Sequence, residues 1–73
     1  MYTNIYAIIT AIDNHSVLII ATAEENELRE TIQKRIYEAR GMLELARRLI
    51  GQQQLVRFLK DHIEWLELKL AGL

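Results

Sequence analysis

A single apolar stripe runs through the middle of the chain and constrains the fold more than any other feature of the sequence. Between Leu28 and Ile50, apolar residues recur at spacings of three and four, which is the period of one face of an α-helix. The stripe consists of Leu28, Ile32, Ile36, Ala39, Leu43, Ala46 and Ile50. Charged residues occupy the opposite face, so only one side of this helix needs to be covered. We therefore predict a long amphipathic helix over residues 24–50, against which the remaining segments pack.

The ends of this helix, and one position inside it, carry local signals. Thr22 and Glu25 have the spacing of a capping box, which predicts Thr22 as the N-cap. Gly51 follows the stripe and can adopt the left-handed conformation that ends many helices. Gly41 lies in the interior, where it is either tolerated or marks a bend or a close approach by another backbone. The stripe keeps its phase across Gly41, so we expect a continuous helix. The alternative is a break there, with a helix that runs on through Gly51.

A second amphipathic segment follows the polar connector Gln52-Gln53-Gln54. Its apolar residues again repeat at three and four: Leu55, Phe58, Leu59, Ile63, Leu66 and Leu70. This pattern predicts a helix over residues 52–71. Because the connector is short, the two helices are expected to be antiparallel neighbours.

The first 23 residues differ sharply in composition from the rest of the chain. Asp13 is their only charged side chain, and residues 5–12 and 17–21 are rich in isoleucine, threonine and valine, which favour strands. The polar cluster at residues 13–16 lies between these runs and is typical of a turn. We therefore predict a β-hairpin over residues 1–23. The fold class is α+β, in the order ββαα, within one domain over residues 1–73.

Both faces of this predicted hairpin are largely apolar. Two helices can cover only one face of a hairpin, so the second face needs another partner. The chain has 73 residues and no cysteine, so disulfides cannot compensate for a small core and oligomerisation is the remaining route. We predict a homo-oligomer, most simply a two-fold dimer, while the sequence leaves open which hairpin face is buried. The predicted self-association residues are Tyr6, Ile8, Ile9, Ile12, Val17 and Ile19.

Basic residues gather around the predicted connection between the two helices. We name this set the basic tip: Arg40, Arg47, Arg48, Arg57 and Lys60. Helix dipoles do not account for it, because the second helix would carry its bases early and its acids late, against its dipole. Trp65 and Leu68 are added as apolar anchors for a partner, since aromatic residues are enriched at binding hot spots. The basic tip suggests an acidic protein surface as its partner or, alternatively, nucleic acid.

No constellation of residues points to catalysis, a cofactor or a metal site. Glu24, Glu25 and Glu27 suit the start of a helix, where the dipole favours acidic charge. His15 is interpreted as part of a turn and His62 as a core or interface histidine, because neither has a nucleophile nearby in sequence. We therefore expect a protein that is not an enzyme and binds no cofactor.

The sequence also favours one function class and one location. We expect a small protein-interaction module, such as a regulator, adaptor or inhibitor, with a nucleic-acid-binding regulator as the alternative. A net charge of −1 gives no global attraction to nucleic acid or acidic lipid. No basic segment precedes the first apolar run, and the polar residues 13–16 interrupt that run, so we expect neither a signal peptide nor a membrane span. The expected location is the cytoplasm.

Overall fold

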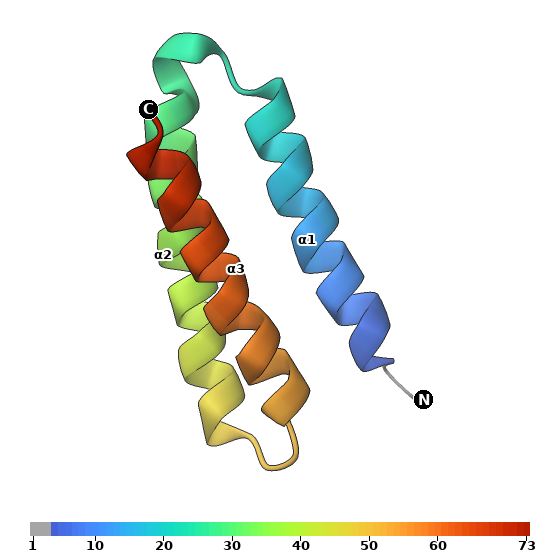
Figure 1. Cartoon of the computed structure of the whole chain (residues 1–73). Coiled ribbons are helices and arrows are strands. Elements are labelled where there is room, and N and C mark those ends of the chain that lie inside the picture. The colour runs from blue at the N-terminus through green and yellow to red at the C-terminus, as the bar shows by residue number, and fades with distance from the viewer. Residues whose placement is uncertain (1–3) are drawn as a thin grey trace.

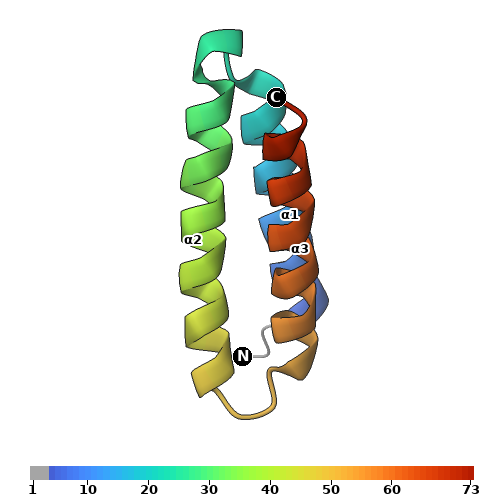
Figure 2. The same ribbon diagram turned by 60° about the vertical axis from the view of Figure 1, so that its left-hand side comes forward.

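The chain folds into three α-helices that lie side by side. The computed structural model describes residues 4–73. Helix α1 spans Ile5–Thr22, a single 3₁₀ turn (η1) spans Glu25–Glu27, and helices α2 and α3 span Leu28–Arg48 and Gln53–Ala71. α1 and α3 run in the same direction and α2 runs opposite to both, as Figures 1 and 2 show. The molecule is elongated, with extents of 40 × 20 × 14 Å.

The predicted β-hairpin is wrong, and so are the α+β class and the ββαα order. Residues 5–22 form one continuous helix, and no strand occurs among residues 4–73. The preference of isoleucine, valine and threonine for strands is weak and depends on context. Polar residues such as Asp13 and Asn14 cost a helix interior only about 0.7 kcal/mol each, and no glycine or proline interrupts this run. The first three residues of the predicted hairpin range lie outside the described part of the chain.

The polar cluster at residues 13–16 continues the helix because one of its members points inward. Counting back from Ser16 in steps of four gives Ile12 and Ile8, and counting forward gives Ile20. These positions share one helical face. Ser16 is fully buried, and Ile12 and Ile20 pack against the hydrophobic core. The inward face of α1 is thus an isoleucine stripe with a serine at its centre, which the interpretation of these residues as a turn concealed.

Helix capping also differs from the expectation. α1 begins at an unpredicted N-cap, Asn4, whose side chain accepts a 2.9 Å hydrogen bond from the Tyr6 amide. Thr22 is the last residue of α1 rather than the N-cap of the central helix. Its hydroxyl donates to the Leu18 carbonyl at 2.8 Å, within the same helix. The central helix therefore begins later than predicted, at Leu28, after the 3₁₀ turn.

Helices α2 and α3 form an antiparallel hairpin that contains the hydrophobic core. The buried apolar residues all come from these two helices: Ile32, Ile36, Ala39, Leu43, Ala46, Leu59, Ile63 and Leu66. α2 passes through Gly41 without a break, as expected. A Cβ placed on Gly41 would meet nothing within 4 Å, so no other backbone approaches closely there. Gly51, in the loop, has a φ of +83°, the one positive φ among the described residues.

α1 lies against this hairpin with far less burial. Ser16 is its only buried residue. Several isoleucines are half-buried, whereas large apolar side chains such as Tyr6 (64 % exposed) and Leu18 (59 % exposed) face outward.

α1 is also the one helix among the described residues whose length and composition suffice to cross a membrane. The expectation of no span rested on a break at residues 13–16, and that break does not exist. Core helices and signal sequences can satisfy the same criterion.

Replacing Gly41 of α2 and Gly51 of the α2–α3 loop with alanine should change the free energy of unfolding in opposite directions. Gly41→Ala should stabilise the fold by about 0.5–1 kcal/mol, because alanine is the better helix former and its methyl group has space. Gly51→Ala should destabilise it by about 1–2 kcal/mol, because a Cβ is strained at positive φ. Urea denaturation midpoints measure both effects. A destabilising Gly41→Ala would show that α2 is not a regular helix at this position.

Candidate interaction surfaces and the buried polar cluster

Three polar side chains meet in the interior where all three helices approach one another. We call them the buried polar cluster: Ser16 of α1, Arg35 of α2 and His62 of α3. Their exposed fractions are 0 %, 4 % and 4 %. The Arg35 Nε donates to Ser16 Oγ at 2.6 Å, and Ser16 Oγ lies 2.7 Å from His62 Nε2. A second Arg35 nitrogen donates to the Ile12 carbonyl at 3.0 Å, so α2 holds both the backbone and the side chain of α1.

Hydrogen-bond chemistry fixes the roles within this cluster. Arginine can only donate, so Ser16 Oγ accepts from Arg35. Among the hydrogen bonds of residues 4–73, His62 Nε2 is the one acceptor within reach of the Ser16 hydrogen, and we assign that hydrogen to it. This arrangement assigns His62 the neutral tautomer with its proton on Nδ1, and Nδ1 lies 3.8 Å from Asp13 Oδ1 at the edge of the cluster. Burial lowers the pKa of His62 below the ordinary value of 6.5; Asp13 opposes this shift and the Arg35 charge adds to it. The rings of Phe58 and Trp65 stack on the imidazole within α3, at centroid distances of 5.1 and 5.5 Å.

Ser16 contacts His62, and His62 faces Asp13, so the three side chains are arranged in space like a nucleophile, a base and an orienting acid. In a working triad the serine oxygen must reach a substrate carbonyl beside an oxyanion hole. Here Ser16 Oγ is sealed among three helices and is occupied by Arg35. The His62–Asp13 separation of 3.8 Å is also too long for a hydrogen bond. We interpret the cluster as the polar joint between α1 and the hairpin.

The outer surface of α1 is a candidate interaction surface. Ala7, Ala11, Asn14, Leu18 and Ala21 recur at spacings of four, three, four and three, and all are exposed. We call this row the α1 outer stripe. Tyr6 and Val17 border it and are also exposed. The stripe is apolar except at Asn14, which lies at the middle of the helix.

The helix divides the predicted self-association residues between its two sides. Tyr6 and Val17 are exposed beside the α1 outer stripe. The four isoleucines of the set, Ile8, Ile9, Ile12 and Ile19, are half-buried, and Ile12 packs against the core of the hairpin. The six predicted residues therefore do not form one surface. Tyr6 and Ile8 are two positions apart, as are Val17 and Ile19, and such residues point in different directions in a helix.

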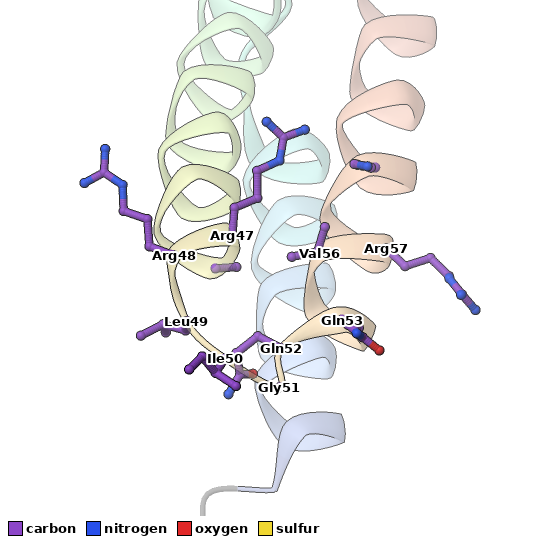
Figure 3. A pocket seen from close by; sticks show the side chains of 11 residues that line it. Arg47, Arg48, Leu49, Ile50, Gly51, Gln52, Gln53, Val56 and Arg57 are labelled. Carbon is purple, nitrogen blue, oxygen red and sulfur yellow. The ribbon is translucent and has the colours of Figure 1, made fainter.

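The five residues of the basic tip do not share one site. Arg47, Arg48, Arg57 and Lys60 border an open pocket beside the α2–α3 loop, together with the exposed side chains of Leu49 and Ile50. Figure 3 shows Arg48 and Arg57 pointing away from each other on opposite sides of the hairpin. Arg40 lies further along α2, 3.6 Å from Glu67 of α3.

Charge pairing weakens the basic tip further. Arg47 lies 3.4 Å from Glu44, one turn earlier in α2. Arg40 is likewise paired, with Glu67. In the described part of the chain, Arg48, Arg57 and Lys60 therefore remain as the members without an ion pair. Arg48 and Arg57 are exposed and point to opposite sides of the hairpin, so these two arginines do not converge on one anion.

The two predicted anchors lie apart from the basic tip. Trp65 is half-buried within α3, with its ring stacked on His62 and covered by Lys69, whose Nζ lies 5.1 Å from the ring centroid. Leu68 is exposed, near the end of α3 that lies opposite the α2–α3 loop. The structure therefore leaves Leu68 available to a partner and gives Trp65 an internal packing role.

Sequence reasoning missed Arg35 and Ser16 as members of the buried polar cluster. Arg35 is three residues after Ile32 and four before Ala39, so its position on the edge of the apolar stripe was available as a signal. The sequence predicts that His62 is a core or interface histidine, but it names no partner for it. Ser16 was hidden by its assignment to a turn.

Comparisons with known proteins do not extend this account. No family model matches the chain, and neither the curated proteins nor the solved structures contain a match to it. The functional argument therefore depends on the residues and geometry described above.

The buried polar cluster predicts unequal effects of two hydroxyl deletions. Ser16→Ala removes the acceptor of the Arg35 Nε inside the protein, which should cost about 1–3 kcal/mol in the free energy of unfolding. Thr22→Ala is the control, because it removes a hydroxyl bonded only within its own exposed helix and should change stability by less than about 0.5 kcal/mol. Chemical denaturation of both variants measures the difference. Equal effects would show that Ser16 is not buried against Arg35.

Proposed function

We propose that this protein is a small, non-enzymatic protein-interaction module that acts as a homo-oligomer through the α1 outer stripe. The observation that carries the proposal is the exposed apolar surface of α1. A helix that is apolar around most of its circumference is normally covered on every side. In the monomer, however, α1 is covered by the hairpin on only one side. Contiguous exposed apolar surface of this kind is typical of an interaction site.

The spacing of the stripe fits a second copy of the same helix. The alternation of four and three is that of a coiled-coil seam. If two α1 helices pair antiparallel about a two-fold axis at Asn14, each Leu18 lies beside Ala11 of the other copy and each Ala7 beside Ala21. Leu18, the one large residue of the stripe, then meets an alanine, and the outer pair joins two alanines. The two Asn14 amides meet on the axis, where each can donate to and accept from the other.

A membrane is a less favourable environment for α1 than a second copy. At about 1.5 Å per residue, its 18 residues extend about 27 Å, close to the hydrocarbon thickness. Asp13, Asn14 and His15 would then lie near the bilayer centre, where an aspartate alone costs about 2.5–3.5 kcal/mol. In a protein interface the same residues can stay at the edge or pair with one another.

A charged substitution in the stripe tests the proposal. Leu18→Glu should convert a dimer to a monomer while leaving the helical content unchanged, because Leu18 faces away from the hairpin. Leu45→Glu is the matched control, since Leu45 is a leucine of similar exposure on α2 (62 % against 59 %) and should leave the dimer intact. Light scattering at micromolar concentration measures the mass.

Three outcomes would count against this proposal. One is a wild-type mass of 8.6 kDa, that of the monomer, at these concentrations. Another is a dimer that is lost in Leu45→Glu and kept in Leu18→Glu. The third is partition of the wild-type protein into neutral phosphatidylcholine vesicles, which would assign α1 to a membrane instead.

The partner beyond a second copy is proposed to be a protein with an acidic surface that meets the four members of the basic tip beside the α2–α3 loop, Arg47, Arg48, Arg57 and Lys60. Nucleic acid is the alternative, and Arg48, Arg57 and Lys60, which lack ion pairs in the described part of the chain, are the observation in its favour. Their divergence supports the protein partner, because phosphate contacts on a duplex require cations along one surface.

Binding to nucleic acid provides a direct test between these two partners. We expect no appreciable binding to random-sequence duplex DNA at physiological salt. Salt-dependent binding at micromolar concentration or below, lost in the double variant Arg47→Glu with Arg48→Glu, would make nucleic acid the leading partner. If a protein partner is captured, the same double variant should weaken its binding and leave the helical content unchanged.

A further inference from the structure

The attachment of α1 to the hairpin includes one buried ionisable side chain, His62. Ser16 is the only buried residue of α1, and its hydroxyl hydrogen can reach only one acceptor in the buried polar cluster, Nε2 of His62. The apolar contacts of α1 are made by half-buried isoleucines. The polar joint is therefore the one place where α1 contributes a buried group to its contact with the hairpin.

We propose that protonation of His62 releases α1 from the α2–α3 hairpin, so that mild acid opens the three-helix bundle. The release exposes the isoleucine face of α1 together with the hairpin surface beneath it. The hairpin stays folded, because every buried apolar residue of the core belongs to α2 or α3, and α1 adds only half-buried residues such as Ile12 and Ile20. This proposal does not depend on the self-association of α1.

The groups around His62 disfavour its protonated form while α1 is docked. A proton on Nε2 turns the only acceptor of the Ser16 hydroxyl into a donor. The Arg35 guanidinium of α2 already donates to the same oxygen, so two cations would flank one hydroxyl in the interior. Among residues 4–73, Asp13 of α1 is the one counter-charge paired with His62; its Oδ1 lies 3.8 Å from His62 Nδ1, and its side chain is half-exposed. The neighbours from α3 itself, Phe58 and Trp65, are uncharged rings.

The direction of the pH effect follows from the lowered pKa. When α1 is released, His62 returns toward the ordinary pKa of 6.5, so the released form binds more protons than the docked form. Docking is therefore strongest above about pH 6.5 and weakens as the pH falls toward the lower pKa of the docked form. Between these two values, the ratio of released to docked molecules rises about tenfold for each pH unit.

Hydrogen exchange with two matched histidine variants tests the proposal. In wild type, amides of α1 should lose protection below about pH 6.5, by up to tenfold per pH unit after correction for the intrinsic exchange rate, while core amides of α2 and α3 keep theirs. His62→Gln retains a side chain that can accept from Ser16 but cannot be protonated in this range, so its α1 protection should stay constant. His15→Gln removes the other, exposed histidine and should behave as wild type.

The results that would overturn the proposal are specific. The same loss of α1 protection in His62→Gln as in wild type would show that His62 is not the titrating group. Simultaneous loss of protection in all three helices would show global unfolding instead of release. If His62→Gln does not fold, an NMR titration of the wild-type His62 ring gives the answer. A pKa at or above 6.5 would then contradict the proposal.

Discussion

The hydroxyl of Ser16, held between Arg35 and His62, is the interaction on which the arrangement of the three helices depends. It is the point at which α1, α2 and α3 all contribute a buried polar group. Burying an arginine is costly unless its donors are satisfied. Here Arg35 finds its acceptors on α1, and no buried side-chain nitrogen or oxygen in residues 4–73 lacks a partner. Removing α1 from the hairpin would leave both Arg35 and His62 without these contacts. The buried polar cluster therefore positions α1 and also favours the docked state over the released one.

The rest of the molecule divides into a hairpin with its own core and a helix that depends on it. α2 and α3 bury each other along matching apolar stripes, so their association follows from the strongest pattern in the sequence. α1 supplies no fully buried apolar residue, and much of its apolar surface faces outward. Local stability in proteins follows burial and contact density, so α1 is the element expected to open first. The exposed apolar surface of α1 is the basis for the proposed self-association. The buried polar cluster on its inner side is the basis for the proposed release in acid.

The hairpin could be predicted from sequence, and α1 could not. The stripes at Ile32, Ala39 and Leu66 indicated the correct period, partner and continuity through Gly41, and errors there were confined to the helix ends. Residues 5–22 carry isoleucine, valine and threonine in runs without a single dominant period, so strand and helix patterns both fit. The deciding contact joins Ser16 to residues 19 and 46 positions away, which no local pattern reveals. The same long separations hid the buried polar cluster, whereas the charges of the basic tip were visible in sequence but their divergence was not.

Solution NMR on the wild-type protein tests the central claim most directly. A helix over residues 5–22 and a β-hairpin over the same residues predict different contacts. The account predicts helical Cα shifts throughout residues 5–22 and nuclear Overhauser contacts between the Ser16 β-protons and the His62 ring protons at neutral pH. Extended-chain shifts with cross-strand contacts between Ile12 and Val17 would contradict it. So would a helical α1 without any contact between Ser16 and His62.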